Sequence, residues 1–447
     1  MHPHAYWRPP RRQRTISAMN SRRITPPISH ATVGGFLPSL AIKLAVAVLI
    51  VLPFVSFVAM FAIYLERKVA GHIQSRRGPM RVGGWHGWLQ SVADGMKLLS
   101  KEDLAPAGAD GALFRLAPYL AFAPVFAAFL ALPWSRDLSG LTRHFGVGVF
   151  FILAMLGLEV LGVILAGWSS NNKWAIYGAM REACQMVSYE IPLGMSIVCC
   201  VLVAGSLNLY AIARVQHSGI TAWLAFHDPF NFAAFFVYYI AALASCKRAP
   251  FDLPESESEL VAGYHTEYSG LRFSIFFFAE YAAMFVVSAI QTTLWLGAWY
   301  DPFGIVRGLE NASRGPQGVI SLPLAIVANG AGLAVFLLKT AGLMYSQMWI
   351  RWTLPRLRID QVLYLCMKVL LPLAFINLLG AATYAWLVDA HRLPVVQRVV
   401  EIGLAVAGCG IVLTVVSMAA WACLTARGRT FKTLYPSTTV FRDLPGA

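Results

Sequence analysis

Long apolar stretches alternate with short polar ones along most of the chain. A membrane-spanning helix needs about 20 predominantly apolar residues, and nine stretches come close to this length: 40–64, 112–133, 145–168, 186–206, 229–246, 273–297, 322–350, 362–388 and 402–424. The stretch 229–246 is short for a span, and 322–350 is long enough to tilt. The pattern predicts an all-α polytopic membrane protein with eight or nine transmembrane helices.

A different pattern follows the first stretch. Residues 65–111 are mostly polar, but five apolar residues recur among them at helical spacing: Trp88, Leu89, Val92, Met96 and Leu99. Because this spacing places them on one face, we predict an amphipathic helix that lies in the membrane interface.

The composition supports the same class of protein. Of 447 residues, 57% are hydrophobic and only 13% are charged, whereas soluble domains contain about 25% charged residues. An ordinary soluble enzyme is therefore excluded. The seven cysteines form no C-x-x-C pair and no cluster with histidine, so we expect neither a metal site nor an iron–sulfur cluster in this chain. The sequence also lacks a nucleotide-binding glycine loop.

The formal charge of +14 comes from 36 Lys and Arg against 22 Asp and Glu. In a membrane protein this excess indicates loop orientation rather than nucleic-acid binding, and we expect no nucleic-acid partner. Loops on one predicted side and the C-terminus hold twenty Lys and Arg, and the alternate loops hold seven. The richer side is expected to be cytoplasmic, with the N-terminus outside and the C-terminus inside.

The first residues differ from the rest of the chain. Residues 1–35 contain six arginines and no acidic residue. This composition is typical of an organelle transit peptide, and the alternative is an over-long start with Met19 as an internal candidate. We expect a disordered basic leader at 1–38, a membrane domain at 39–388, and an additional helix with a basic tail at 389–447. A bacterial inner membrane is favoured over a mitochondrial one.

Several ionisable residues fall at membrane depth, where a charge at a helix centre costs about 2.5 to 3.5 kcal/mol on insertion scales. At 1.5 Å per residue, Glu159, Glu190 and Glu280 lie roughly 13, 6 and 10 Å from the inner ends of their stretches. Lys339 lies about 16 Å deep and is a candidate to neutralise one of them or a neighbouring water path. Three carboxyls in one layer predict a proton-transfer route. The alternative is that each acid only hydrogen-bonds between helices or reaches the interface.

The predicted inside loop after 229–246 is rich in charge. Lys247 and Arg248 precede four acids within eight residues, and Pro250 and Pro254 stiffen the backbone. The acids are Asp252, Glu255, Glu257 and Glu259; Glu255 and Glu259 would share a face of a helix that began after Pro254. His265 and Glu267 add proton-exchanging groups before the next stretch. The alternative is an acidic surface loop.

The first inside loop has the opposite character. After Glu66 and Arg67, a turn rich in Gly and Pro carries Arg76, Arg77 and Arg81. Such arginines can bind an anionic or carbonyl-bearing partner, and the alternative is lipid headgroups. The neighbouring amphipathic helix favours a lipophilic ligand that reaches this turn from the bilayer.

Seven collinear motifs then carry a resemblance to a known family. They are ERK (66–68), RGP with RVG (77–79 and 81–83), GWSSNNK (167–173), QMVSYE (185–190), RAPFDLPE (248–255), ELVAGYHTEY (259–268) and RWTLPR (351–356). In this order, over residues 40–388, they resemble the H subunit of NADH-quinone oxidoreductase, respiratory complex I. Met80 departs from the pattern, where Asn is usual, and so does Glu182, where a small residue is usual.

The resemblance implies an all-helical subunit of a proton-pumping NADH:quinone oxidoreductase. In that family the subunit anchors the peripheral arm to the membrane arm and forms the membrane side of the quinone chamber. Quinone is the substrate, while FMN and iron–sulfur clusters are expected in partner subunits only. The partners would be the peripheral-arm quinone-site subunits and the membrane-arm antiporter-like subunits, with lipid around them.

Two sets of candidate residues follow from the residues and the resemblance together. The proton-transfer candidates are Glu159, Glu190, Glu280, Asp252, Glu255, Glu257, Glu259, Glu267 and Lys339. The quinone-chamber candidates are Glu66, Arg67, Arg76, Arg77, Arg81, Trp88, Asp103 and Phe251. Two alternative functions remain: the equivalent subunit of a membrane-bound hydrogenase, and a stand-alone cation or proton transporter. A transporter would favour two repeats with broken helices, which the sequence does not display.

Overall fold

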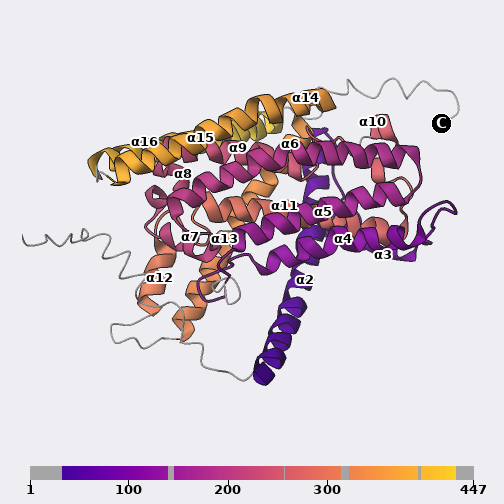
Figure 1. Cartoon of the computed structure of the whole chain (residues 1–447), viewed down its shortest axis with the longest axis horizontal. Helices are drawn as coiled ribbons and strands as arrows, with labels where there is room; N and C mark the ends of the chain where they lie inside the picture. The colour runs from indigo at the N-terminus through magenta and orange to yellow at the C-terminus, as the bar shows by residue number, and fades with distance from the viewer. Residues whose placement is uncertain (1–32, 139–144, 256, 314–321, 391–393, 429–447) are drawn as a thin grey trace, which may run out of the picture. The chain divides into compact units, whose positions relative to one another are not determined.

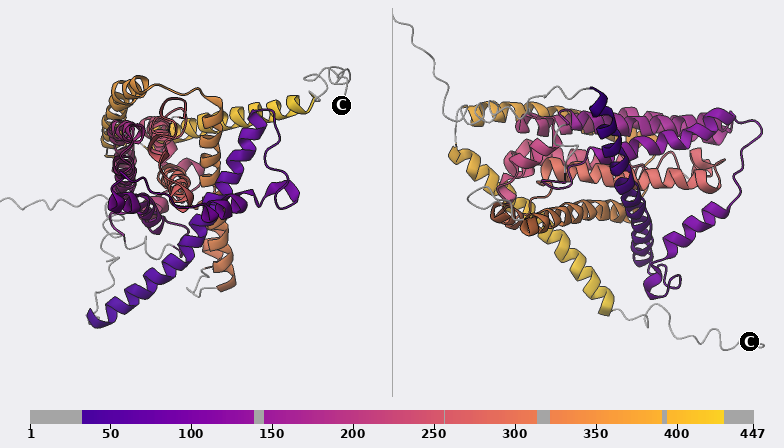
Figure 2. Two further views of the ribbon diagram at one scale, coloured as in Figure 1. Left: turned by 90° about the vertical axis from the view of Figure 1, so that its right-hand side faces the viewer. Right: turned by 90° about the horizontal axis from the view of Figure 1, so that it is seen from below.

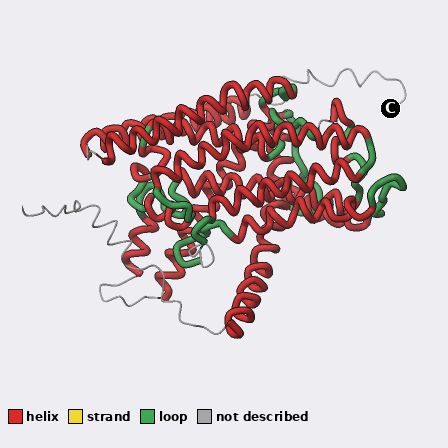
Figure 3. The backbone as a smooth tube through the Cα atoms, in the orientation of Figure 1, coloured by secondary structure: helices red, strands yellow, loops and turns green. Residues whose placement is uncertain are grey.

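A computed structural model describes residues 33–138, 145–255, 257–313, 322–390 and 394–428. Throughout these residues the backbone forms helices and loops without strands (Figure 3). Eight of the described helices are long and apolar enough to cross a membrane. The predicted all-α polytopic fold is therefore confirmed.

The long helices follow the predicted stretches in order. They are α2 (Val33–Ile73), α4 (Gly111–Leu130), α5 (Gly148–Ser169), α6 (Lys173–Ala204), α11 (Gly270–Trp295), α13 (Leu322–Thr353) and α16 (Pro394–Gly428). An eighth span, Ile359–Val388, combines α14 (Ile359–Tyr364), η5 (Leu365–Leu370), α15 (Leu371–Tyr384) and part of η6 (Ala385–Ala390). The apolar helix α9 (Pro229–Ser245) has 17 residues, so the stretch that was short in sequence is short in structure.

Shorter helices connect these spans. They are η1 (Trp85–Gly87), α3 (Gln90–Ser100), α7 (Leu209–Val215), η3 (Ile220–Ala222), α8 (Leu224–His227), α10 (Glu257–Leu260), η4 (Gly263–His265) and α12 (Ile305–Ser313). On α3, Met96 and Leu99 expose 65% of their surface, and Trp88 just before it exposes 59%. The predicted amphipathic helix thus exists, and its apolar side faces away from the described chain.

Two predicted stretches are shorter than the helices that contain them. Helix α2 runs from Val33 to Ile73, whereas the predicted stretch is 40–64. Of the predicted leader, 1–38, residues 1–32 lie outside the described residues. Helix α6 begins at Lys173 rather than at residue 186, because the Asn172 side chain caps it by accepting a hydrogen bond from the Trp174 amide at 3.0 Å. Hydropathy ends a span at its first charges, but these helices continue because the charges find partners.

Chain contacts divide the protein into two units at Pro53 and Phe54. The first unit is described only from Val33, as the start of α2. In the second unit α4 packs on α5, α5 on α6, and α6 on α9 and α15, while α11 packs on α4 and α13 (Figures 1 and 2).

Two packing features determine where the central helices lie. Gly162 of α5 lets the α4 backbone approach closely, since an added Cβ would lie 2.5 Å from the Ala121 nitrogen. Helix α11 is buried on every side from Ala279 to Trp295, as expected for a helix that is apolar all round. A charged side chain in this buried part of α11, such as Glu280, must therefore be neutralised within the protein.

Candidate functional site

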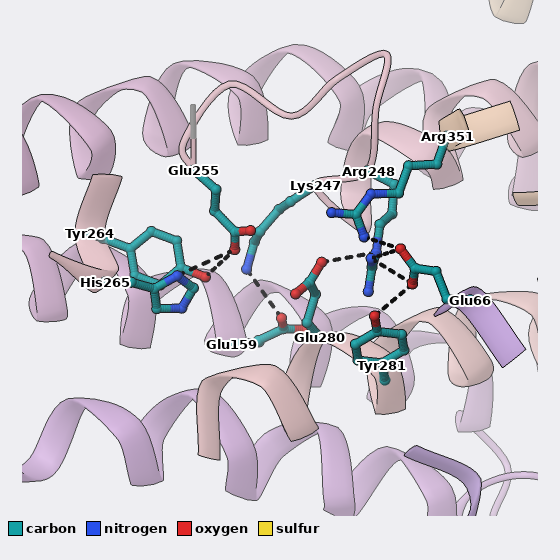
Figure 4. A network of polar contacts seen from close by, with 10 residues as sticks. All are labelled: Glu66, Glu159, Lys247, Arg248, Glu255, Tyr264, His265, Glu280, Tyr281 and Arg351. Carbon is teal, nitrogen blue, oxygen red and sulfur yellow. Dashed lines mark hydrogen bonds and ion pairs between the residues drawn. The ribbon is translucent and has the colours of Figure 1, made fainter. Parts of the chain in front are cut away.

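Segments far apart in the sequence meet at one end of the second unit. Glu66 comes from α2, Lys247 and Arg248 from the turn after α9, Glu280 from α11, and Arg351 from the end of α13 (Figure 4). Glu66, Lys247, Arg248 and Arg351 belong to loops that the charge count assigned to one side of the membrane, whereas Glu280 lies within α11. We call this set, together with Glu159, Glu182 and Tyr281, the charged chain.

Glu66 forms one end of the charged chain. Its carboxylate is 4% exposed and accepts hydrogen bonds from Arg248 Nη1 at 3.2 and 3.1 Å and from the Tyr281 hydroxyl at 2.6 Å. Arg351 also pairs with it. A carboxylate with two guanidinium partners carries a strongly compensated negative charge.

Arg248 links the Glu66 end of the charged chain to the middle of that set. Its Nε lies 2.9 Å from Glu280 Oε1, and its guanidinium stacks over the Tyr281 ring at 4.3 Å. Burial opposes the charge, but Glu280 and Glu66 raise the pKa of Arg248 above its ordinary value. Arg248 is therefore a permanent cation between two acids.

Lys247 repeats the arrangement with two further acids. Its ammonium is 3% exposed and lies 3.3 Å from Glu159 and 3.6 Å from Glu182. Burial opposes the charge here too, but Glu182 and Glu159 raise the pKa of Lys247. One cation between two acids leaves an excess negative charge when both acids are ionised, so this triad can hold and release a proton.

The turn that carries both cations is held by Gln185 of α6. The Gln185 side-chain amide donates to the Ala244 carbonyl at 2.8 Å and to the Phe251 carbonyl at 3.0 Å, at the two ends of the turn. Lys247 adopts a positive φ of 52° within it. Gln185 therefore positions the turn from which consecutive cations reach different acids.

Beyond Lys247 the polar contacts continue through Glu255. The Tyr264 hydroxyl donates to Glu255 Oε1 at 2.8 Å, and His265 Nδ1 lies 3.7 Å from the same oxygen (Figure 4). Burial lowers the pKa of His265 to about 4, so its ring is neutral near pH 7. Near pH 7 this ring would accept a proton only if its surroundings became more negative.

Close backbone packing holds this loop against α6. Gly263 has a φ of +57°, and an added Cβ would lie 1.7 Å from the Pro254 carbonyl oxygen. Gly178 of α6 faces the same loop, with its Cβ position 2.9 Å from that oxygen and from the Tyr264 nitrogen. Larger residues at either position would push the loop off the helix.

The other loop acids have separate partners. Arg181 donates to Glu259 at 2.6 Å and lowers the pKa of its carboxyl, while Asn172 donates to Glu267 at 2.6 Å. Asp252 is half-buried, and the side chain of Glu257 lies outside the described residues. Glu255 and Glu259 do not share a helix face as expected, because α10 begins only at Glu257.

Two membrane-depth candidates lie apart from the charged chain. Glu190 is half-buried beside Gly157, whose Cβ position is 3.3 Å from Glu190 Oε1, and none of its described contacts is an ion pair. Lys339 does not pair with any acid of the charged chain. Its ammonium donates to the Leu296 and Tyr300 carbonyls at 2.5 and 2.6 Å, and so caps the far end of α11.

The quinone-chamber candidates are divided between surface and interior. Arg76, Arg77 and Arg81 are exposed, Arg67 pairs with Asp94, and Asp103 pairs with Arg272 at 2.8 Å. Trp88 is exposed, whereas Phe251 is buried. The described side chains therefore do not gather these candidates around one pocket.

An apolar groove of about 180 Å³ lies between α2 and α13. Its walls include Phe57, Phe61 and Leu65 of α2 and Leu337 and Met344 of α13. Leu65 directly precedes Glu66, so the groove runs alongside the helix that carries one end of the charged chain.

Sequence reasoning missed five of the eight residues of the charged chain. Lys247, Arg248, Glu182, Tyr281 and Arg351 were not among the candidates. Lys247 and Arg248 directly follow an apolar helix, and Glu182 lies inside one. Cations at the end of an apolar span would have been the signal, because at such a position they require acidic partners.

Fold and site together define a polytopic helical membrane protein with a buried chain of alternating acids and bases. No group of three metal-ligating side chains occurs among the described residues. The family model described as NADH dehydrogenase matches residues 45–382. The chain therefore belongs to the family of the H subunit of NADH-quinone oxidoreductase, a membrane component of that enzyme.

Several curated relatives support this assignment. The chain is 42% identical to the NADH-quinone oxidoreductase H subunit of Chlorobium luteolum, over 78% of this chain and 91% of the relative. The H subunit of Anaeromyxobacter dehalogenans is 42% identical, over 80% and 85%. That of Geobacillus thermodenitrificans is 43% identical, over 76% and 92%. The resemblance predicted for residues 40–388 is confirmed, and membership of a multisubunit oxidoreductase implies its other subunits as partners.

Proposed function

We propose that this protein forms the membrane side of the quinone chamber and the start of the proton-transfer route in NADH:quinone oxidoreductase. The observation that carries the proposal is the charged chain, in which acids and bases alternate from Glu66 through Arg248 and Glu280 towards Lys247 and Glu159. Alternation lets a change of charge at one end propagate, because each cation can move its pairing from one acid to the next.

The quinone would act on the Glu66 end. The apolar groove beside α2 suits an isoprenoid tail, and the basic turn with Arg76, Arg77 and Arg81 suits a headgroup carbonyl. Reduction adds negative charge to the headgroup before protons arrive. This charge would draw Arg351 and Arg248 away from Glu66, so that Glu66 would then take up a proton.

The Lys247 triad would continue the transfer. When Arg248 leaves Glu280, that carboxyl becomes undercompensated, and Lys247 is the neighbouring cation that can respond. Movement of Lys247 from Glu182 towards Glu280 leaves Glu182 to bind a proton. A pKa change of one unit corresponds to about 1.36 kcal/mol, so several acids must respond together for pumping against a membrane potential.

The remaining roles follow from this arrangement. FMN and iron–sulfur clusters would lie in peripheral-arm subunits that deliver electrons, and antiporter-like membrane subunits would receive the proton signal. The loops with the Lys and Arg excess meet at the charged chain, which supports their common cytoplasmic side in a bacterial inner membrane. Residues 39–388 would form the membrane domain that contains the quinone chamber and the proton route, and residues 389–447 an additional helix with a basic tail.

Glu280→Gln tests the proton route. We expect the assembled enzyme to lose proton pumping per NADH oxidised, because Arg248 would lose one of its two acids. Glu310→Gln is a matched control, since Glu310 of α12 is also buried and pairs with an arginine, Arg136, at 2.6 Å, outside the charged chain. Unchanged pumping in Glu280→Gln, or an equal loss in both variants, would contradict the proposal.

A further inference from the structure

A second set of buried polar side chains lies between α11 and α13, outside the charged chain. Ser288 and Thr292 of α11 and Thr340 and Gln347 of α13 are all fully buried. Gln347 Nε2 donates to Ser288 Oγ at 3.3 Å, and the hydroxyl oxygens of Thr340 and Thr292 lie 3.4 Å apart. We call these four residues the polar seam.

Helix α9 adds polar groups beside the seam. Gln291 of α11 donates to the Phe235 carbonyl at 3.2 Å, and the hydroxyls of Tyr239 and Ser346 lie 2.6 Å apart. A junction of three membrane helices is thus lined by amide and hydroxyl groups where hydrocarbon side chains would pack at least as well. Polar side chains do join membrane helices, but such a role should leave their hydrogen bonds satisfied.

At this junction two side-chain amides lack some of the hydrogen bonds that they could form. The side-chain oxygens of Gln347 and Gln291 are buried and have no hydrogen-bond partner among the described residues. Exchanging the two amide atoms of Gln347 does not help, because the Ser288 hydroxyl already donates to the Met284 carbonyl at 2.8 Å and the amide nitrogen would then be unpaired. A buried acceptor without a donor costs about 1 to 3 kcal/mol, and water is the ligand that satisfies such groups.

The polar seam lies between the charged chain and the end of α11 that Lys339 caps. Gln347 lies one helical turn from Arg351, which pairs with Glu66 in the charged chain. At the other end, the Thr292 carbonyl accepts hydrogen bonds from the Leu296 and Ala298 amides, and the carbonyls of these two residues bind Lys339.

We propose that the polar seam is a binding site for a file of water molecules, which carries protons between the charged chain and the end of α11 capped by Lys339. The water site stands on the unsatisfied amides alone, while its role in proton transfer rests on the proposed function. Each hydroxyl of the seam donates to the carbonyl four residues earlier in its own helix, so it presents only lone pairs to the file. The hydroxyls would therefore hold the water molecules by accepting from them, and a proton would pass from water to water without any side chain of the seam becoming charged.

Two adjacent threonines provide a matched pair of variants. Thr292 and Thr293 are both fully buried and both donate to the carbonyl four residues earlier, at 2.9 and 2.8 Å. Only the Thr292 hydroxyl also contacts Thr340. In membranes with the assembled enzyme, we expect Thr292→Val to lose proton pumping per NADH oxidised, and Thr293→Val to retain it. Equal ratios in the two variants would overturn the proton path.

A direct measurement tests the water site. An electron cryomicroscopy map of the assembled enzyme, at a resolution that resolves water, should contain density within hydrogen-bond distance of the side-chain oxygens of Gln347 and Gln291. Dry packing or a protein donor at both oxygens would overturn the site. Pumping lost in Glu280→Gln but kept in Thr292→Val would refute the seam alone, whereas pumping kept in both would refute the proposed function as well.

Discussion

Replacing Lys247 by methionine removes the cation that lies between Glu159 and Glu182 while keeping an unbranched side chain of similar length. Both acids are buried within helices, and the ammonium is their described ion-pair partner at 3.3 and 3.6 Å. At these distances each attraction is worth about 5 kcal/mol at an effective dielectric constant of about 20. Removal of one partner from a buried ion pair typically costs about 3 to 5 kcal/mol, since the charge left behind is uncompensated.

We therefore expect Lys247→Met to destabilise the protein by about 3 to 5 kcal/mol. The measurement is the half-life of NADH–quinone reductase activity in membranes at a fixed elevated temperature, together with the amount of this chain retained in the purified enzyme. A half-life is the appropriate quantity because a large membrane assembly unfolds irreversibly.

A second substitution separates charge from packing. In Lys247→Met with Glu182→Gln, one of the two uncompensated acids is gone, so part of the lost half-life should return. Lys247→Met with a wild-type half-life would refute the reasoning. A double variant less stable than the single one would also refute it, because the effect would then arise from packing rather than from charge.

Three further predictions concern other parts of the site. Gly178→Ala should cost about 1 to 3 kcal/mol of stability by pushing the 254–264 loop off α6, whereas Gly194→Ala, with open space around its Cβ position, should leave the thermal half-life unchanged. The pKa of His265 is lowered to about 4 from an ordinary 6.5. The unfolded chain therefore binds a proton at His265 at a higher pH than the folded chain does, so the stability that the neutral ring contributes is complete above pH 6.5 and is lost as pH falls towards 4. Acid incubation should inactivate the wild-type enzyme over this range, and the His265→Gln enzyme less steeply. Lys339→Met should remove the donor that caps α11 and shorten the thermal half-life, because each carbonyl left without a partner costs about 1 to 3 kcal/mol of stability. An unchanged half-life would contradict this prediction and would show that water replaces the ammonium.

The position of each acid along its helix could be worked out from sequence, because rise per residue gives that position, but the partners of the acids could not. Glu159 and Glu280 lie in the charged chain. Glu190 does not, because the direction in which a side chain leaves its helix depends on how neighbouring helices pack. Lys339 was placed near the acids for the same reason, although it faces the opposite end of α11.

The end of α2 and the start of α6 could not be predicted from sequence for a related reason. The predicted stretches end at residue 64, before Glu66, and begin at residue 186, after Arg181 and Glu182, since an isolated helix would not carry these charges into a membrane. In the folded chain, the Glu66 carboxylate is neutralised by Arg248 and Arg351, which lie 182 and 285 residues away in sequence.

The sequence by itself determined the membrane class, the amphipathic helix and the family, and it limited the spans to eight or nine. Each depends on composition, on local periodicity or on collinear motifs, which are properties of neighbouring residues. Only the tertiary structure decided which acid meets which base, and that Lys247 and Arg248, adjacent in sequence, serve different pairs of carboxylates. The physical reason is that a buried charge is stabilised by whichever opposite charge the packing of distant helices brings within a few ångströms, and local pattern does not encode that distance.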